Sequence, residues 1–219
     1  MDAPDGSTGP VALADLLTGG AIRRITRWGE EIMHRPTTPV TVFDAELHDF
    51  LRDMFATMDV ADGVGLAATQ VDDGRSCFVF RCPDIDGEIV TGVVCNPVVV
   101  VPQGDRRALV SEEEGCLSLP GAYESLARPD HAICRGFDHN GDPIEIVGTG
   151  MLARCLQHET DHLNGIVFGD RLSTRRRKHL YAAHDAIAYR YPDDWPVSPR
   201  GPLDPVKAAE AKRSSARAR

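Results

Sequence analysis

The sequence predicts an α+β domain in which short antiparallel strands surround one inner helix, with further helices toward the N-terminal and C-terminal ends. Three observations predict this fold. Apolar residues recur at three- and four-residue spacing over residues 43–62, which indicates an amphipathic helix. Short apolar runs between turn dipeptides follow over residues 77–147 and indicate strands. A second helical segment then covers residues 150–164.

Length and composition indicate one globular domain with tails. The chain has 219 residues, of which 42% are hydrophobic and 26% charged, as in ordinary globular proteins. The net charge of -9 does not favour nucleic acid, so we expect no DNA partner. The sequence shows neither a basic, apolar leader nor a long apolar stretch, so we expect no membrane contact and a cytoplasmic location. The six cysteines form no C-x-x-C pair and are weak evidence for disulfides.

The N-terminal part divides into an extension and the first helix. Residues 1–20 are rich in Gly, Pro, Asp, Thr and Ala, which predicts a weakly ordered extension with a short helix near residues 11–17. The helix over residues 43–62 is expected to begin at a capping box formed by Thr41 and Asp44.

The middle of the chain predicts strands separated by turn dipeptides such as Asn96-Pro97 and Asn140-Gly141. The Asn-Gly pair between two apolar runs is a hairpin signal. The expected strands cover residues 77–81, 89–95, 98–101, 107–110, 132–137 and 144–147.

Two helices complete the predicted domain. The helix over residues 150–164 has Thr149 as its expected N-cap. A third helix is expected over residues 174–191. Beyond it the composition turns to Pro, Ala, Lys and Arg, which predicts a mobile tail over residues 192–219 and a folded domain over residues 21–191.

The clearest chemical signal is the sequence His158-Glu159-Thr160-Asp161-His162. Residues four apart share one face of a helix, so His158 and His162 can reach the same metal ion. Glu159 lies about 100° further round the helix. A carboxylate there can handle the proton of a water at the metal. The alternative is a pair of histidines on a solvated helix.

A catalytic metal usually has three protein ligands, and the sequence offers candidates for the third on both sides. Zincin peptidases, which also use H-E-x-x-H, take their third ligand downstream. His179 and His184 lie downstream here, without a matching signature. Upstream, residues 114–118 read Glu-Gly-Cys-Leu-Ser and offer the thiolate of Cys116.

A third segment, residues 63–70, reads Gly-Val-Gly-Leu-Ala-Ala-Thr-Gln. Its two glycines allow close approach of a ligand to the backbone. The amide of Gln70 can donate to an oxyanion and accept from a water. The alternative is a tight helix-to-strand turn with a surface glutamine.

Together these segments resemble the three signature motifs of the peptide deformylase family. The motifs are G-x-G-L-A-A-x-Q at residues 63–70, E-G-C-L-S at residues 114–118 and Q-H-E-x-D-H-L-x-G at residues 157–165. They stand in the family's order and at compatible spacing. The resemblance covers most of residues 23–172, and residues 148–163 look especially like the bacterial members from actinobacteria.

The resemblance implies hydrolysis of the N-terminal formyl group from nascent N-formylmethionyl polypeptides, with release of formate. It implies one divalent metal ion, Fe2+, with Zn2+, Ni2+ or Co2+ possible in purified protein. The central helix would then be the metal-binding helix of a deformylase-like catalytic domain over residues 21–191. The site residues that it implies are the metal ligands Cys116, His158 and His162, the catalytic residues Glu159, Gln70 and Leu117, and the substrate-binding residues Gly65 and Leu117.

Neighbouring residues carry further expectations. Glu114 is expected to pair with Arg128 and brace the Cys116 segment, the alternative being an exposed arginine. Asp161 either orients a metal ligand or is a surface carboxylate. A deep apolar slot should take the methionine side chain, and Cys155 with the residues after Leu117 are candidates for its wall, general core packing being the alternative.

Basic residues near the C-terminus predict a contact with the ribosome, because some family members dock there through a basic C-terminal helix. Residues 175–178 are Arg-Arg-Arg-Lys, and residues 200–219 hold six Lys or Arg against two acidic residues. The alternative is a solvated charge run.

The competing functions are a zincin-like metallopeptidase and a non-enzymatic ribosome-associated or metal-storage protein. Glu159 and Gln70 argue against the latter, since ligation alone needs neither.

Overall fold

The computed structural model describes residues 9–104 and 108–201 of the chain. The strands are β1 (Gly65–Ala67), β2 (Cys77–Pro83), β3 (Ile89–Val100), β4 (Leu109–Gly115), β5 (Tyr123–Pro129), β6 (His131–Phe137) and β7 (Pro143–Thr149). The helices are α1 (Ala45–Val60), α2 (Gly150–Leu163) and α3 (Thr174–Asp185), with short 3-10 helices η1 (Leu13–Leu16), η2 (Glu31–His34), η3 (Ala68–Val71), η5 (Phe168–Arg171) and η6 (Ala188–Arg190).

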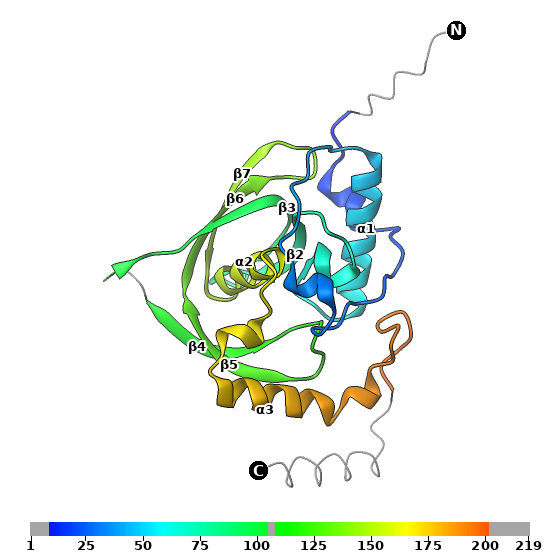
Figure 1. Ribbon diagram of the computed structural model, residues 1–219. Helices are drawn as coiled ribbons and strands as arrows, with labels where there is room; N and C mark the ends of the chain where they lie inside the picture. The colour runs from blue at the N-terminus through cyan, green and yellow to red at the C-terminus, as the bar shows by residue number, and fades with distance from the viewer. Residues whose placement is uncertain (1–8, 105–107, 202–219) are drawn as a thin grey trace.

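Helix α2 lies at the centre of the molecule, as Figure 1 shows. It packs against every strand of an antiparallel five-stranded sheet with the order β1-β2-β3-β6-β7 and also against β5. Strands β4 and β5 form a separate two-stranded sheet, with α3 running beside it. The predicted α+β class with an inner helix is confirmed. Among the helices of the described residues, none is long and apolar enough to cross a membrane.

Helix α1 begins two residues later than predicted because Asp44 caps it directly. The Asp44 side chain accepts a hydrogen bond from the Leu47 backbone N–H at 3.0 Å. The expected capping box with Thr41 is therefore wrong. The apolar face of α1 is buried as its spacing predicted, and the side chains that form it are Leu47, Phe50, Leu51, Met54, Phe55 and Met58.

The turn expected at Asn96-Pro97 is a bulge inside β3. Asn96 adopts the left-handed backbone conformation with φ of 53°, and the register against β6 shifts there. The Asn96 amide also accepts a hydrogen bond from the Val40 N–H at 2.8 Å and donates to the Val40 carbonyl at 2.9 Å. The strands predicted over residues 89–95 and 98–101 are therefore one strand.

The small sheet differs most from the prediction. Strand β4 runs to Gly115, whereas a strand was expected over residues 107–110, and residue 107 lies outside the described part of the chain. Strand β5 was not predicted at all. A two-stranded sheet leaves many side chains exposed, so its strands carry consecutive polar residues such as Glu112 and Glu113 and lack the apolar runs of a central sheet.

Helix α3 ends at Asp185, earlier than the predicted residue 191. The chain then turns back over residues 186–201 and packs Tyr191 and Trp195 against Ile25 and Ala61. The packing of Trp195 was not anticipated, because the predicted mobile tail began at residue 192.

The N-terminal segment also packs more closely than its composition suggested. Leu16 in η1 is fully buried in the core beside α1, although residues 1–20 were expected to be weakly ordered. The remaining parts of the two predicted tails, residues 1–8 and 202–219, lie outside the described residues.

Candidate active site

Three side chains from two separate segments converge on one point. His158 and His162 lie one turn apart on α2, and Cys116 follows directly after β4. The Nε2 atoms of the two histidines are 3.1 Å apart, and Cys116 Sγ lies 3.3 Å from His162 Nε2. The three possible ligand atoms all lie within 4.8 Å of one another, and both histidines are buried. The residues predicted as metal ligands are therefore brought together.

The downstream histidines are directed elsewhere. His179 Nδ1 lies 3.2 Å from Glu124, and His184 Nδ1 lies 3.2 Å from the Pro120 carbonyl oxygen. The zincin arrangement consequently gains no third ligand from either. The set that does converge, one thiolate and two imidazoles, fits a divalent transition metal such as iron, zinc, cobalt or nickel.

Glu114 is buried two residues before Cys116 and holds one of the histidines. Its carboxylate accepts hydrogen bonds from Arg128 at 2.7 and 2.8 Å and lies 2.7 Å from His158 Nδ1. Burial alone would raise the pKa of Glu114, but the hydrogen bonds from Arg128 and His158 outweigh it and hold the pKa well below its usual range. The expected Glu114–Arg128 pair is confirmed.

Two further charged residues extend this network. Asp161 is buried and accepts a hydrogen bond from Arg128 at 2.9 Å, so it is neither a surface carboxylate nor a direct partner of a histidine in this geometry. Arg154 donates to Glu114 at 2.8 Å and was missed by the sequence analysis. Its position four residues before His158, on the same helix face, was the available signal.

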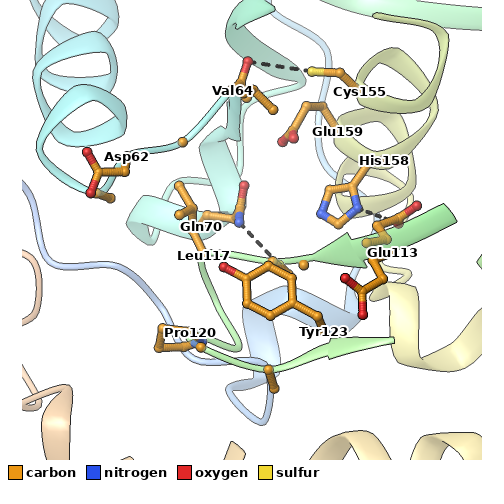
Figure 2. A pocket seen from close by; sticks show the side chains of 18 of the residues that line it. Asp62, Val64, Gln70, Glu113, Leu117, Pro120, Tyr123, Cys155, His158 and Glu159 are labelled. Carbon is orange, nitrogen blue, oxygen red and sulfur yellow. Dashed lines mark hydrogen bonds and ion pairs between the residues drawn. The ribbon is translucent and has the colours of Figure 1, made fainter. Parts of the chain in front are cut away.

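Glu159 lies beside the converging ligands and is 4% exposed. A Cβ added at Gly65 would lie 2.5 Å from Glu159 Oε1, so glycine is the residue that leaves room for this carboxylate. Burial raises the pKa of Glu159 to about 7. A carboxyl group with a pKa near neutral can both accept and release a proton. Figure 2 shows the Glu159 carboxylate directed toward the side of the cleft that holds Gln70.

Gln70 is buried, so the alternative of a surface glutamine is wrong. Its Oε1 accepts a hydrogen bond from the Ala67 N–H at 2.8 Å, which turns the amide nitrogen toward the site. That nitrogen lies 3.3 Å from Ser118 Oγ and 3.6 Å from Cys116 Sγ. The amide is therefore held as a donor next to the converging ligands.

One cleft with a volume of about 400 Å³ exposes much of this site, and Gln70, Cys116, His158 and Glu159 line it together with Glu114 and Arg154. Cys155 lines this cleft beside Glu159, and so do residues 120–122, which were the other candidates for the wall of a methionine slot. Figure 2 shows Asp62 and Pro120 on the opposite side of Gln70 from Cys155. The cleft therefore extends from α2, past Gln70, to a wall built by other parts of the chain. The residues that the C-terminal segment adds to this wall are Tyr191, Trp195 and Arg200.

A Cys-His-His cluster with an adjacent buried carboxylate and an oriented amide has the parts of a metal-dependent hydrolase. Comparison with known proteins agrees: the family described as polypeptide deformylase matches residues 22–178. The chain is 49% identical over 173 residues to peptide deformylase 1 of Streptomyces avermitilis, covering 79% of this chain and 80% of that protein.

Solved structures give the same result. The peptide deformylase of Legionella pneumophila superposes with a TM-score of 0.69 and 39% identity, over 78% of this chain and 100% of that one. The Acinetobacter baumannii deformylase, solved with Met-Ala-Ser bound, superposes with a TM-score of 0.64 and 29% identity, over 70% of this chain and 100% of that one. This chain belongs to the peptide deformylase family, metal-dependent hydrolases that remove the N-terminal formyl group from nascent peptides.

Proposed function

We propose that Cys116, His158 and His162 hold one divalent metal ion, Fe2+, and that the cleft around it deformylates nascent N-formylmethionyl chains in the cytoplasm. The observation that carries the proposal is the convergence of one thiol and two imidazoles beside the buried carboxyl of Glu159. A divalent ion held there lowers the pKa of a water and so supplies a nucleophile near neutral pH.

The chain's own residues divide the remaining work. Glu159 takes a proton from the attacking water and delivers it to the amine nitrogen as the C–N bond breaks. The amide of Gln70 and the backbone N–H of Leu117 donate to the formyl oxygen while negative charge grows on it. The Gly65 backbone, which passes directly over Glu159, holds the peptide so that its formyl carbon meets that water.

The methionine side chain is placed on the α2 side of the cleft. Cys155, Met151 and Arg154 line that side. An unbranched, polarizable side chain suits such a wall because it can follow an irregular apolar surface. Formyl-Met peptides should therefore be hydrolysed with much higher kcat/KM than formyl-Asp peptides.

The basic start of α3 supports a second proposal, docking on the ribosome near the emerging peptide. Arg176 donates to the Ser125 carbonyl at 2.8 Å and Arg177 lies 3.4 Å from Asp170. Arg175 and Lys178 have no ion pair among the residues that the structure describes, and their charges are free to meet phosphates. The basic residues predicted to help beyond position 201 lie outside that part.

Assay of the anaerobically purified, iron-loaded protein on formyl-Met-Ala-Ser tests the catalytic proposal. We expect stoichiometric release of formate and a free amine, with no cleavage of a matched acetylated peptide that offers only internal peptide bonds. Cleavage of the internal bonds would instead favour the zincin-like metallopeptidase. Elemental analysis of protein prepared without added metal identifies the ion.

Co-sedimentation with ribosomes at low and moderate salt tests the docking proposal. The full chain should pellet at low salt and less as salt rises, because phosphate contacts release counterions. A variant with residues 175–178 made neutral should pellet less, whereas an Arg135→Ala variant, changed on β6, serves as the matched control. Equal pelleting of all three proteins would remove α3 as the anchor.

A further inference from the structure

The wall of the cleft that faces away from α2 is built by a segment outside the family match. The match ends at residue 178, yet Tyr191, Trp195 and Arg200 line the cleft. On the same side lie Asp62 and Pro120, which precede and follow the motif segments. The active-site cleft of this chain is therefore completed by residues that the family pattern does not contain.

This C-terminal wall is firmly attached to the domain. The Ile25 N–H donates to the Trp195 carbonyl at 2.9 Å, and Arg27 donates to the carbonyls of Tyr191 and Pro192 at 3.2 and 2.8 Å. Trp195 is 3% exposed and packs edge-on against Tyr191, with ring centroids 5.3 Å apart. Because backbone and rings are both held, the wall has a defined shape in the free protein.

Arg200 is the cationic side chain of the wall, and the carboxylate of Asp62 lies on the same side of the cleft. Its guanidinium carbon lies 5.3 Å from the centroid of the Tyr191 ring, a cation–π contact that holds the exposed side chain over the cleft rim. No carboxylate pairs with Arg200 among the residues that the structure describes. The Gly201 N–H donates to the Arg190 carbonyl at 2.9 Å, which ties the end of the segment that carries Arg200 back to its start. An oriented, unpaired guanidinium at a cleft rim is suited to carbonyl and carboxylate oxygens.

We propose that Tyr191, Trp195 and Arg200 form a subsite for the peptide chain that follows the methionine, with Arg200 binding its carbonyl or carboxylate oxygens. The inference rests on the proposed function. With the formyl group beside Glu159, the substrate has two branches at the methionine Cα, the side chain and the continuing backbone. The α2 side takes the side chain, so the backbone leaves along the other side toward the wall. An acidic residue downstream of the methionine is then favoured over a basic one.

The test measures kcat/KM on formyl-Met-Ala and on five-residue formyl-Met peptides with Ala, Asp or Lys at the third, fourth or fifth position. The proteins are wild type, Arg200→Ala, Arg200→Glu and the matched exposed variant Arg135→Ala. Wild type and Arg135→Ala should gain from the longer peptides. In Arg200→Ala the ratio of five-residue to two-residue kcat/KM should fall about two- to fivefold, as for one exposed charge contact.

Charge reversal provides the sharper readout. The readout is the kcat/KM of the Asp peptide divided by that of the Lys peptide, at the position where the two differ most in wild type. This ratio should be lower in Arg200→Glu than in Arg200→Ala. Far-ultraviolet circular dichroism of each variant reports folding. Two results would overturn the subsite, provided that wild type still hydrolyses formyl-Met-Ala. One is an Asp-to-Lys ratio of kcat/KM in Arg200→Glu that equals the wild-type ratio at all three positions. The other is a wild-type kcat/KM that does not rise from the two-residue to the five-residue peptides. Absence of any deformylation by wild type would instead refute the proposed function.

Discussion

Replacement of Arg154 by methionine should loosen the connection between the two segments that carry the proposed metal ligands. Arg154 projects from α2 and donates through Nη1 to Glu114 at 2.8 Å and to the Leu126 carbonyl at 3.0 Å. Its Nη2 donates to the Val110 carbonyl at 3.0 Å. One buried side chain therefore ties the histidine helix to both strands of the β4–β5 sheet, from which Cys116 follows.

The size of the effect follows from these contacts. Breaking a buried ion pair by removing one partner costs roughly 3–5 kcal/mol. Two carbonyl groups also lose a charged donor, at about 1 kcal/mol or more each. Glu114 keeps its bonds from Arg128 and His158, and the methionine retains most of the packing of the arginine stem, which offsets part of the loss. We therefore expect the free energy of unfolding to fall by about 3–5 kcal/mol in Arg154→Met.

Urea unfolding of the metal-loaded protein measures this change, with Arg135→Met as the matched control. Arg135 also pairs with one carboxylate, Glu145 at 2.6 Å, but the two side chains are 57% and 48% exposed. The control should therefore lose less than about 1 kcal/mol. Competition with a chelator should in addition show metal affinity reduced about 10–100-fold in Arg154→Met. Equal unfolding curves for the two variants would refute the role assigned to Arg154.

Three further outcomes follow from the site. Glu159→Ala should keep its metal by elemental analysis yet lose about 10²–10⁴-fold in kcat, and loss of the ion under excess metal would instead make Glu159 a ligand. Gln70→Glu should lose about 10²–10³-fold in kcat while its Tm stays above that of Gln70→Leu, because only the carboxylate still accepts from the Ala67 N–H; equal Tm values would contradict that anchoring role. Once the metal is removed, iodoacetamide should label Cys116 before the other five cysteines, because those are buried and burial raises the pKa of Cys134 to about 12. Mass spectrometry locates the label, and preferential labelling of another cysteine would contradict this prediction.

The features that the sequence predicted well are those with a local period. The apolar spacing that predicted α1 depends on one helix facing one core, and the structure buries that face. His158 and His162 are four residues apart, so any helix there places them on one face. The pairing of Glu114 with Arg128 was also predictable, because a buried carboxylate needs a cationic partner.

Features set by exposure or by the left-handed backbone were missed. Strand β5 and most of strand β4 were not predicted, because the sheet that they form is open to solvent and its polar residues resemble those of a loop. Asn96-Pro97 has the composition of a turn, yet hydrogen bonds to Val40, 56 residues away in sequence, hold Asn96 within β3. The position of Arg154 four residues before His158 indicated only a shared helix face. Its partner Glu114 is 40 residues away in sequence, so the ion pair could not be predicted from that position alone.

Glu114 explains why the ligand set is coherent although its members are far apart in sequence. It lies two residues before Cys116, and its carboxylate accepts from Nδ1 of His158, 44 residues later. The proton on Nδ1 leaves Nε2 with its lone pair directed at the other ligands, which is the tautomer that metal binding requires. Hydrogen bonds from Arg128 and His158 hold the pKa of Glu114 low and keep it ionised, so the acceptor persists. A neutral replacement at Glu114 would therefore disturb the thiolate segment and the histidine tautomer together, and the two ligands depend on one buried charge.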